Sequence, residues 1–172
     1  MSTFVNEPIL ELRREPTRFA LTDALGRLDA TLPLRVPVLV GDGEGMAEGI
    51  DSTDPGRPDR LVARAGVASA RDVDHAVARA TRAQPEWARR RPEERADALR
   101  RAANLLRAER HTLAALQVRE CGKPWAEADA DVCEAIDFLD FYGREMVRLG
   151  GPHPTTPYPG EENEVRYMPL RV

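Results

Sequence analysis

The strongest constraint on the fold is the helical periodicity that runs through residues 69–149. Apolar side chains recur there every three or four positions, the spacing that places them on one face of an α-helix. Ser69 begins a capping-box pattern, and Pro92 and Pro124 each stand where a further helix can begin, because the first helical turn does not use the N–H that proline lacks. The stretch therefore predicts three amphipathic helices, the second of which runs from Pro92 to about Glu120.

Short strands are expected on both sides of these helices. The run LRVPVLV at 34–40 predicts one strand, which its proline places at an edge or a bulge, and LVARAGVA at 61–68 predicts another. Residues 41–60, rich in Gly, Asp and Pro, are expected to form turns, residues 152–163 a proline-rich linker, and EVRYMPLRV at 164–172 a last strand. Two short strands are marginal alone. Either partners outside the chain complete the sheet or the strands pair with each other in a compact α+β domain, and the pattern leaves both open.

The chain divides on this basis into four parts. Residues 1–33 hold an extended lead and a helix that Thr17 can cap, and residues 34–68 hold the short strands and turns. The three-helix segment occupies 69–150, and the linker with its strand occupies 151–172.

Composition excludes several classes of protein. Lys and Arg number 25 against 29 Asp and Glu, a net charge of −4, so a nucleic-acid partner is not expected. No run approaches the roughly 18 consecutive apolar residues of a membrane span, and no basic lead with an apolar run marks a secretory signal. Cys121 and Cys133 are not accompanied by further zinc-ligand residues. They are expected to be packing residues rather than nucleophiles. A reducing cytoplasm is the simplest location for such a chain.

Two further motifs are tempting but weak. Gly41–Gly45 follows a strand, yet a dinucleotide fingerprint needs a third glycine where Met46 stands and a helix beginning there, so a hairpin turn is predicted instead. The histidines His75, His111 and His153 are each isolated, so no metal site is expected.

The third helix carries the most informative side chains. One broad face is apolar and predicts ordinary core, and its members are Ala128, Val132, Ala135, Ile136, Leu139, Gly143 and Met146. Asp129 and Asp140 fall toward the margin of that face. Glu134 lies on the opposite side together with Phe138 and Phe141, which predicts a partly buried carboxylate between aromatic rings. Such a carboxylate needs a cationic partner. A ligand ammonium is one candidate and an arginine from elsewhere in the chain is the other, and the pattern alone favours the arginine.

The same helix carries a family resemblance. ECGKPWAEADADVCEAIDFLDFYGREM at 120–146 resembles the aldehyde dehydrogenase superfamily, and within it the branch that oxidises L-glutamate γ-semialdehyde, the 1-pyrroline-5-carboxylate dehydrogenases. Three other stretches agree with it: Phe4 to Pro8, Trp87 through PEERADALRRAANLLRAER, and PYPGEENEVRYMPLRV. The resemblance covers essentially the whole chain in order.

The resemblance implies an α/β fold with an incomplete sheet: amphipathic helices of the cofactor domain and short strands of the oligomerisation arm, as the N-terminal portion of a longer enzyme. Glu134 matches a family glutamate that can face the substrate ammonium, which favours the ligand over the arginine. The catalytic cysteine, glutamate and asparagine segments of the family have no counterpart here, and Arg171 stands where the family usually has glycine. The implied reaction is NAD-dependent oxidation of the semialdehyde to L-glutamate in proline catabolism.

Several expectations follow from the resemblance to the N-terminal portion of the family's enzymes. No catalytic residue is assigned to this chain, which is expected to be inactive and not to bind NAD alone, and residues 160–172 are expected to join subunits of a homo-oligomer. A non-catalytic assembly or binding module derived from the family, and an unrelated acidic α+β domain with chance similarity, are the alternatives.

Overall fold

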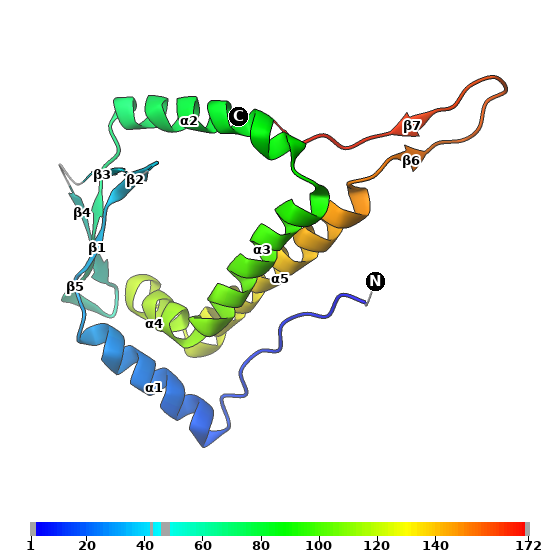
Figure 1. Ribbon diagram of the computed structural model, residues 1–172. Coiled ribbons are helices and arrows are strands. Elements are labelled where there is room, and N and C mark those ends of the chain that lie inside the picture. The colour runs from blue at the N-terminus through cyan, green and yellow to red at the C-terminus, as the bar shows by residue number, and fades with distance from the viewer. Residues whose placement is uncertain (1–2, 42, 46–48, 171–172) are drawn as a thin grey trace.

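The computed structural model describes residues 3–41, 43–45 and 49–170, and five helices and seven strands are found within them (Figure 1). The helices are α1 (Glu15–Asp29), α2 (Ala70–Arg89), α3 (Pro92–Ala108), α4 (Arg110–Cys121) and α5 (Trp125–Leu149). The strands are β1 (Leu34–Val36), β2 (Val38–Val40), β3 (Gly43–Gly45), β4 (Gly49–Asp54), β5 (Arg57–Gly66), β6 (His153–Pro154) and β7 (Glu164–Val165). The α/β class with small, incomplete sheets agrees with the expectation.

The strands form three small sheets. In the first, β5 lies between β1, which pairs with it in parallel, and β4, which pairs with it antiparallel. The strand expected at 34–40 is divided, because Pro37 cannot donate a ladder hydrogen bond and the chain leaves the sheet there. β2 and β3 instead form the hairpin that was predicted around Gly41, although Asp42 and Met46 lie outside the described residues.

The expectation that 41–60 contains only turns is wrong. β4 and the first residues of β5 form an antiparallel pair there, with irregular register around Ser52–Asp54. Their sequence is polar because β4 is an edge strand, whose side chains are mostly exposed. The last strand is much shorter than the nine residues expected, since only Glu164–Val165 pair, with His153–Pro154. Arg171 and Val172 lie outside the described residues.

The helices begin and end mostly where the sequence predicts. The capping box at α2 is confirmed, because Ser69 Oγ accepts from Asp72 N while Asp72 Oδ2 accepts from Ser69 N. Gly122 follows α4 in the left-handed conformation, with φ of 67°, as its role as a cap predicts. Thr17 is not the cap of α1, which begins two residues earlier with proline in its first turn.

The helix expected from Pro92 to Glu120 is two helices. The chain leaves helical geometry at Glu109, with φ of −98° and ψ of 13°, and α4 starts at the next residue. Both α3 and α4 then pack against α5, and α1 packs on α4 (Figure 1). The break therefore lets one stretch of sequence cover two successive parts of α5.

The core between these helices is built mainly from small side chains. Its centre consists of Leu21, Ala103, Ala114, Ala128, Val132 and Ile136. Ala135 was expected on this face but is exposed, and Cys133 and Asp129 are buried instead. The buried face of α5 is thus rotated toward Asp129 and away from Glu134. In contrast, α2 contains no buried residue along its 20-residue length.

A buried ion pair joins the core to the N-terminal lead. Asp129 is 0% exposed, and its two oxygens accept from Arg110 Nε at 2.6 Å and Nη2 at 2.8 Å. The same groups bind the lead, because Leu10 N donates to Asp129 Oδ2 and Arg110 Nη2 donates to the Pro8 carbonyl. The extended residues before α1 are held along α5 by these bonds.

Removal of one member of this pair is expected to destabilise the chain strongly. Arg110→Met leaves Asp129 buried without its counter-ion and removes the guanidinium donor of the Pro8 carbonyl. The free energy of unfolding should therefore fall by about 3–5 kcal/mol in urea denaturation. Arg13→Met removes a similar two-bond pair, with Glu11, at an exposed site and should change the free energy of unfolding far less, because solvent screens an exposed pair. Equal losses in the two variants would contradict the buried pair's importance.

Candidate active-site face

Glu134 lies near the middle of α5 on the face that carries the aromatic rings. The side chain is exposed, so the prediction of a partly buried carboxylate is wrong. Burial would need a layer over this face, and Phe138 and Phe141 are themselves 50% and 40% exposed. Across residues 3–41, 43–45 and 49–170, no arginine forms an ion pair with Glu134, so the local partner that was considered for it is not found.

The rings around Glu134 contact one another. Phe138 and Tyr142 stack with centroids 5.9 Å apart, and Phe141 meets Tyr142 edge-on at 5.4 Å. Phe4 from the N-terminal lead packs edge-on against Phe141 at 5.6 Å. This cluster gives the aromatic face a fixed shape, since edge-on and stacked pairs are the favoured ring geometries.

A cavity of about 230 Å³ opens between the lead and this face. It is lined by Phe4, Asn6, Glu134, Asp137, Phe138, Phe141 and Tyr142. One of its two carboxylates is already satisfied, because Asp137 accepts from Asn6 Nδ2 at 2.8 Å and from Glu7 N at 2.7 Å. Glu134 is therefore the acidic group of the cavity that is available to a ligand.

The cavity has the chemistry of a site for a small cation. A carboxylate attracts an ammonium group directly, and the faces of neighbouring rings attract it through their quadrupoles. Phe4 and Asn6 were not predicted to lie beside Glu134, because about 130 residues separate them from it in sequence. One feature of the sequence could have indicated Phe4 and Asn6. The Phe4–Pro8 stretch resembles the same family as residues 120–146.

The other chemical candidates stand apart from this cavity. No group of three metal-binding side chains is found in the described part of the chain. Gly41 and Gly43 lie in a hairpin between two strands, so that segment does not form the strand–turn–helix arrangement that holds a dinucleotide. Among the helices of the described ranges, none combines the length and apolar content that crossing a bilayer requires.

The fold and this face define a class of protein, and the comparisons identify it. The model of the aldehyde dehydrogenase family matches residues 42–172, which is more than half of the chain. The chain belongs to the aldehyde dehydrogenase family.

The similar proteins carry a more particular name. The chain is 38% identical to a 1-pyrroline-5-carboxylate dehydrogenase of Geobacillus thermodenitrificans over 98% of its own length and 33% of the relative's. It is 36% identical to 1-pyrroline-5-carboxylate dehydrogenase 1 of Halalkalibacterium halodurans over 100% of its length and 34% of the relative's. The chain thus spans about a third of the length of the curated relatives it matches.

Solved structures agree with these sequence relatives. The Thermus 1-pyrroline-5-carboxylate dehydrogenase with bound NAD superposes with a TM-score of 0.92 and 35% identity, over 99% of this chain and 33% of that one. Proline utilization A of Bdellovibrio bacteriovorus superposes with a TM-score of 0.92 and 33% identity, over 96% of this chain and 17% of that one. The similarity in structure therefore extends over nearly the whole chain.

The two cysteines are expected to differ in reactivity. Cys121 is exposed, whereas Cys133 is buried, and burial raises the pKa of the Cys133 thiol, whose Sγ donates to the Pro8 carbonyl at 3.9 Å. At pH 8, one thiol should react quickly with a chromogenic disulfide and the second only after urea is added. A Cys121→Ser control should show no fast phase. Two equally fast thiols in the folded chain would contradict the burial of Cys133.

Proposed function

We propose that this chain forms the N-terminal portion of an enzyme that oxidises L-glutamate γ-semialdehyde to L-glutamate with NAD, in the catabolism of proline. The observation that carries the proposal is similarity to 1-pyrroline-5-carboxylate dehydrogenases along essentially all of the chain. The substrate is an amino-acid aldehyde, and it differs from simple aldehydes by its ammonium and carboxylate groups.

Glu134 is the residue that we assign to substrate binding. Its carboxylate is exposed in a ring-lined cavity, and the neighbouring Asp137 is occupied by the lead. An ammonium group placed there gains a charged hydrogen bond and the faces of the nearby rings. The role proposed for Glu134 is to orient the amino-acid end of the substrate, which leaves the aldehyde free to reach the reacting groups.

The chemical step is assigned to other parts of the enzyme. NAD supplies a hydride acceptor when it is bound, and β2 pairs with β3 beside Gly41 as a hairpin rather than leading into a helix. Within this chain, residues 69–150 are proposed to belong to the cofactor domain and residues 160–172 to an arm that joins subunits in the cytoplasm. The contribution of the chain is then to bind substrate and to assemble the enzyme.

The proposal is tested in a chimera that carries residues 1–172 in place of the matching third of the Geobacillus thermodenitrificans enzyme. Glu134→Gln removes the charge that attracts the ammonium group but keeps the side chain's size. We expect kcat/KM for the semialdehyde to fall about 10- to 100-fold, the usual effect of losing one charge-assisted hydrogen bond, while kcat/KM for propionaldehyde stays within about twofold.

The matched control is Glu127→Gln, which changes another exposed glutamate near the start of α5. It should leave both substrates unaffected. Equal losses for the semialdehyde and propionaldehyde in the Glu134→Gln chimera would reject the ammonium contact. A wild-type chimera that oxidises propionaldehyde but not the semialdehyde would reject the proposed substrate.

The chain by itself is expected to produce no NADH from NAD and pyrroline-5-carboxylate. The reason is that nucleophile, oxyanion donors and nicotinamide must be held together for this chemistry, and no residue of the chain is assigned to them. Absorbance at 340 nm measures the reaction. Steady NADH formation by the purified chain, lost on heating, would contradict the assignment of the chemical step to other parts of the enzyme.

A further inference from the structure

Asp137 is the carboxylate of the Glu134 cavity that binds the N-terminal lead. Its Oδ2 accepts from Asn6 Nδ2 at 2.8 Å, and its Oδ1 accepts from Glu7 N at 2.7 Å. Asp137 lies three residues after Glu134, so the two carboxylates are on the same side of α5 and both line the cavity. Hydrogen bonds to an ionised acceptor are stronger than those between neutral groups. The Asp137 side chain is therefore a strong anchor for the lead beside Glu134.

These bonds place the Phe4 ring, because Phe4 lies only two residues before Asn6 in the extended lead (Figure 1). The ring packs edge-on against Phe141, with centroids 5.6 Å apart. The Arg144 guanidinium lies 5.9 Å from the centre of the Phe4 ring, within the range of a cation–π interaction. Phe4 is thus held against α5 at the cavity that it lines.

The lead has a second set of anchors, which do not involve Asp137. Three hydrogen bonds of 2.8–2.9 Å join residues 7–10 to Arg107, Arg110 and Asp129. The loss of Asp137 is therefore expected to free the first residues of the lead, while its later residues stay in place and the helices keep their packing.

Glu134 needs a wall beside it in order to select its ligand. Its side chain is exposed, and an ion pair formed at an exposed site gains little because water screens it. The lead supplies Phe4 and Asn6 to the cavity, so part of the cavity wall comes from the lead rather than from α5. An aromatic ring in that wall displaces water and attracts an ammonium group by its face. The lead therefore strengthens the attraction that Glu134 exerts on a cation.

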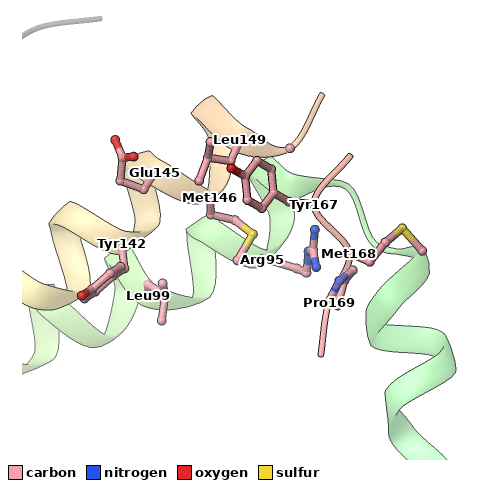
Figure 2. Close-up of a pocket in the computed structure, with 10 residues that line it drawn as sticks. Arg95, Leu99, Tyr142, Glu145, Met146, Leu149, Tyr167, Met168 and Pro169 are labelled. Atoms are coloured by element: carbon pink, nitrogen blue, oxygen red, sulfur yellow. The ribbon is translucent and has the colours of Figure 1, made fainter. Parts of the chain in front are cut away.

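A second cavity beside the first does not offer this chemistry. Tyr142 lines both cavities, and the second one, of about 240 Å³, is also lined by Arg95 and Glu145 (Figure 2). Arg95 stays charged at every pH that proteins meet, so it repels an ammonium group. Glu145 binds Arg148 through contacts of 2.6–3.0 Å. Of the two cavities, the one at Glu134 is therefore suited to an ammonium group.

We infer that Asp137 is a positioning residue of the substrate site and that Phe4 is a specificity-determining residue. Asp137 holds the lead across α5, and Phe4 then forms the wall against which the substrate's ammonium group meets Glu134. Asp137 acts through the lead and not through a contact with substrate, since both of its oxygens already accept hydrogen bonds. The inference rests on the proposed function, because it states how the same site recognises an amino-acid aldehyde.

The test uses the chimera described above, with the semialdehyde and propionaldehyde as substrates. Asp137→Ala removes the anchor, and Phe4→Leu keeps an apolar side chain but removes the ring. For both variants we expect KM for the semialdehyde to rise about 3- to 30-fold, the range of one cation–π interaction, with kcat within about twofold. KM for propionaldehyde, which has no ammonium group, should stay within about twofold.

Asp137→Asn separates positioning from charge. The amide oxygen of the new side chain can accept from Glu7 N, and the Asn6 amide can turn so that its oxygen accepts from the new amide nitrogen. The anchor is kept and the negative charge is lost, so KM for the semialdehyde should stay within about twofold of that of the unchanged chimera. A rise as large as that in Asp137→Ala would overturn the inference, because Asp137 would then attract the substrate directly.

Hydrogen exchange measures the anchor without measuring activity. The Glu7 amide donates to Asp137, so it should exchange slowly in the unchanged chimera, quickly in Asp137→Ala and slowly again in Asp137→Asn. Mass spectrometry of a peptide over residues 4–9 reads this exchange. Slow exchange that persists in Asp137→Ala would contradict the role of Asp137 as the anchor.

The matched controls are Val5→Ala, at an exposed position of the lead, and Asp131→Ala, a carboxylate of α5 outside the cavity. Both should keep the KM values and the exchange of the unchanged chimera. A selective loss in Glu134→Gln without one in Asp137→Ala and Phe4→Leu would overturn this inference and leave the proposed function intact. Equal losses for both substrates in Glu134→Gln would instead reject the ammonium contact, and this inference with it.

Discussion

The pairing of Arg110 with Asp129 is the interaction on which the arrangement of the helices depends. It joins α4 to α5 at a buried position, and both partners also bind the N-terminal lead. A short break at Glu109 places Arg107 as well as Arg110 where both can reach α5 and the lead, since Arg107 binds Asp140 and Glu7. Small residues in the core allow the helices to approach closely enough for these bonds to form.

The two sides of α5 therefore have different surroundings. One side is fixed by buried contacts with α3, α4 and the lead. The other presents Glu134 and its rings to solvent, with Phe4 and Asn6 placed over it by the same lead. Because one extended segment contacts both sides, the position of the candidate substrate site is coupled to the integrity of the core.

Much of the helical architecture could be predicted from the sequence, because caps and periodicity are local signals. Ser69, Gly122 and the start near Pro124 mark helix ends correctly. The break at Glu109 could not be predicted, since no proline or glycine marks it and tertiary contacts with α5 favour it. The pairing of β4 with β5 was missed for a similar reason: an edge strand needs little apolar alternation. At the candidate site, helical periodicity placed Glu134 on the same side of the helix as the rings. It could not show how exposed the Glu134 side chain is, because burial depends on segments far away in sequence.

The lead makes its bonds with groups that lie 100 to 131 positions further along the chain. On a ribosome, Glu7 and Pro8 have no partner until Arg107 and Arg110 have left the exit tunnel, and Asn6 and Leu10 have none until α5 has followed. These residues are consequently among the last of the chain to find their places. A chaperone or protease that meets the nascent chain encounters this stretch as an unpaired extended segment that carries the aromatic residue Phe4.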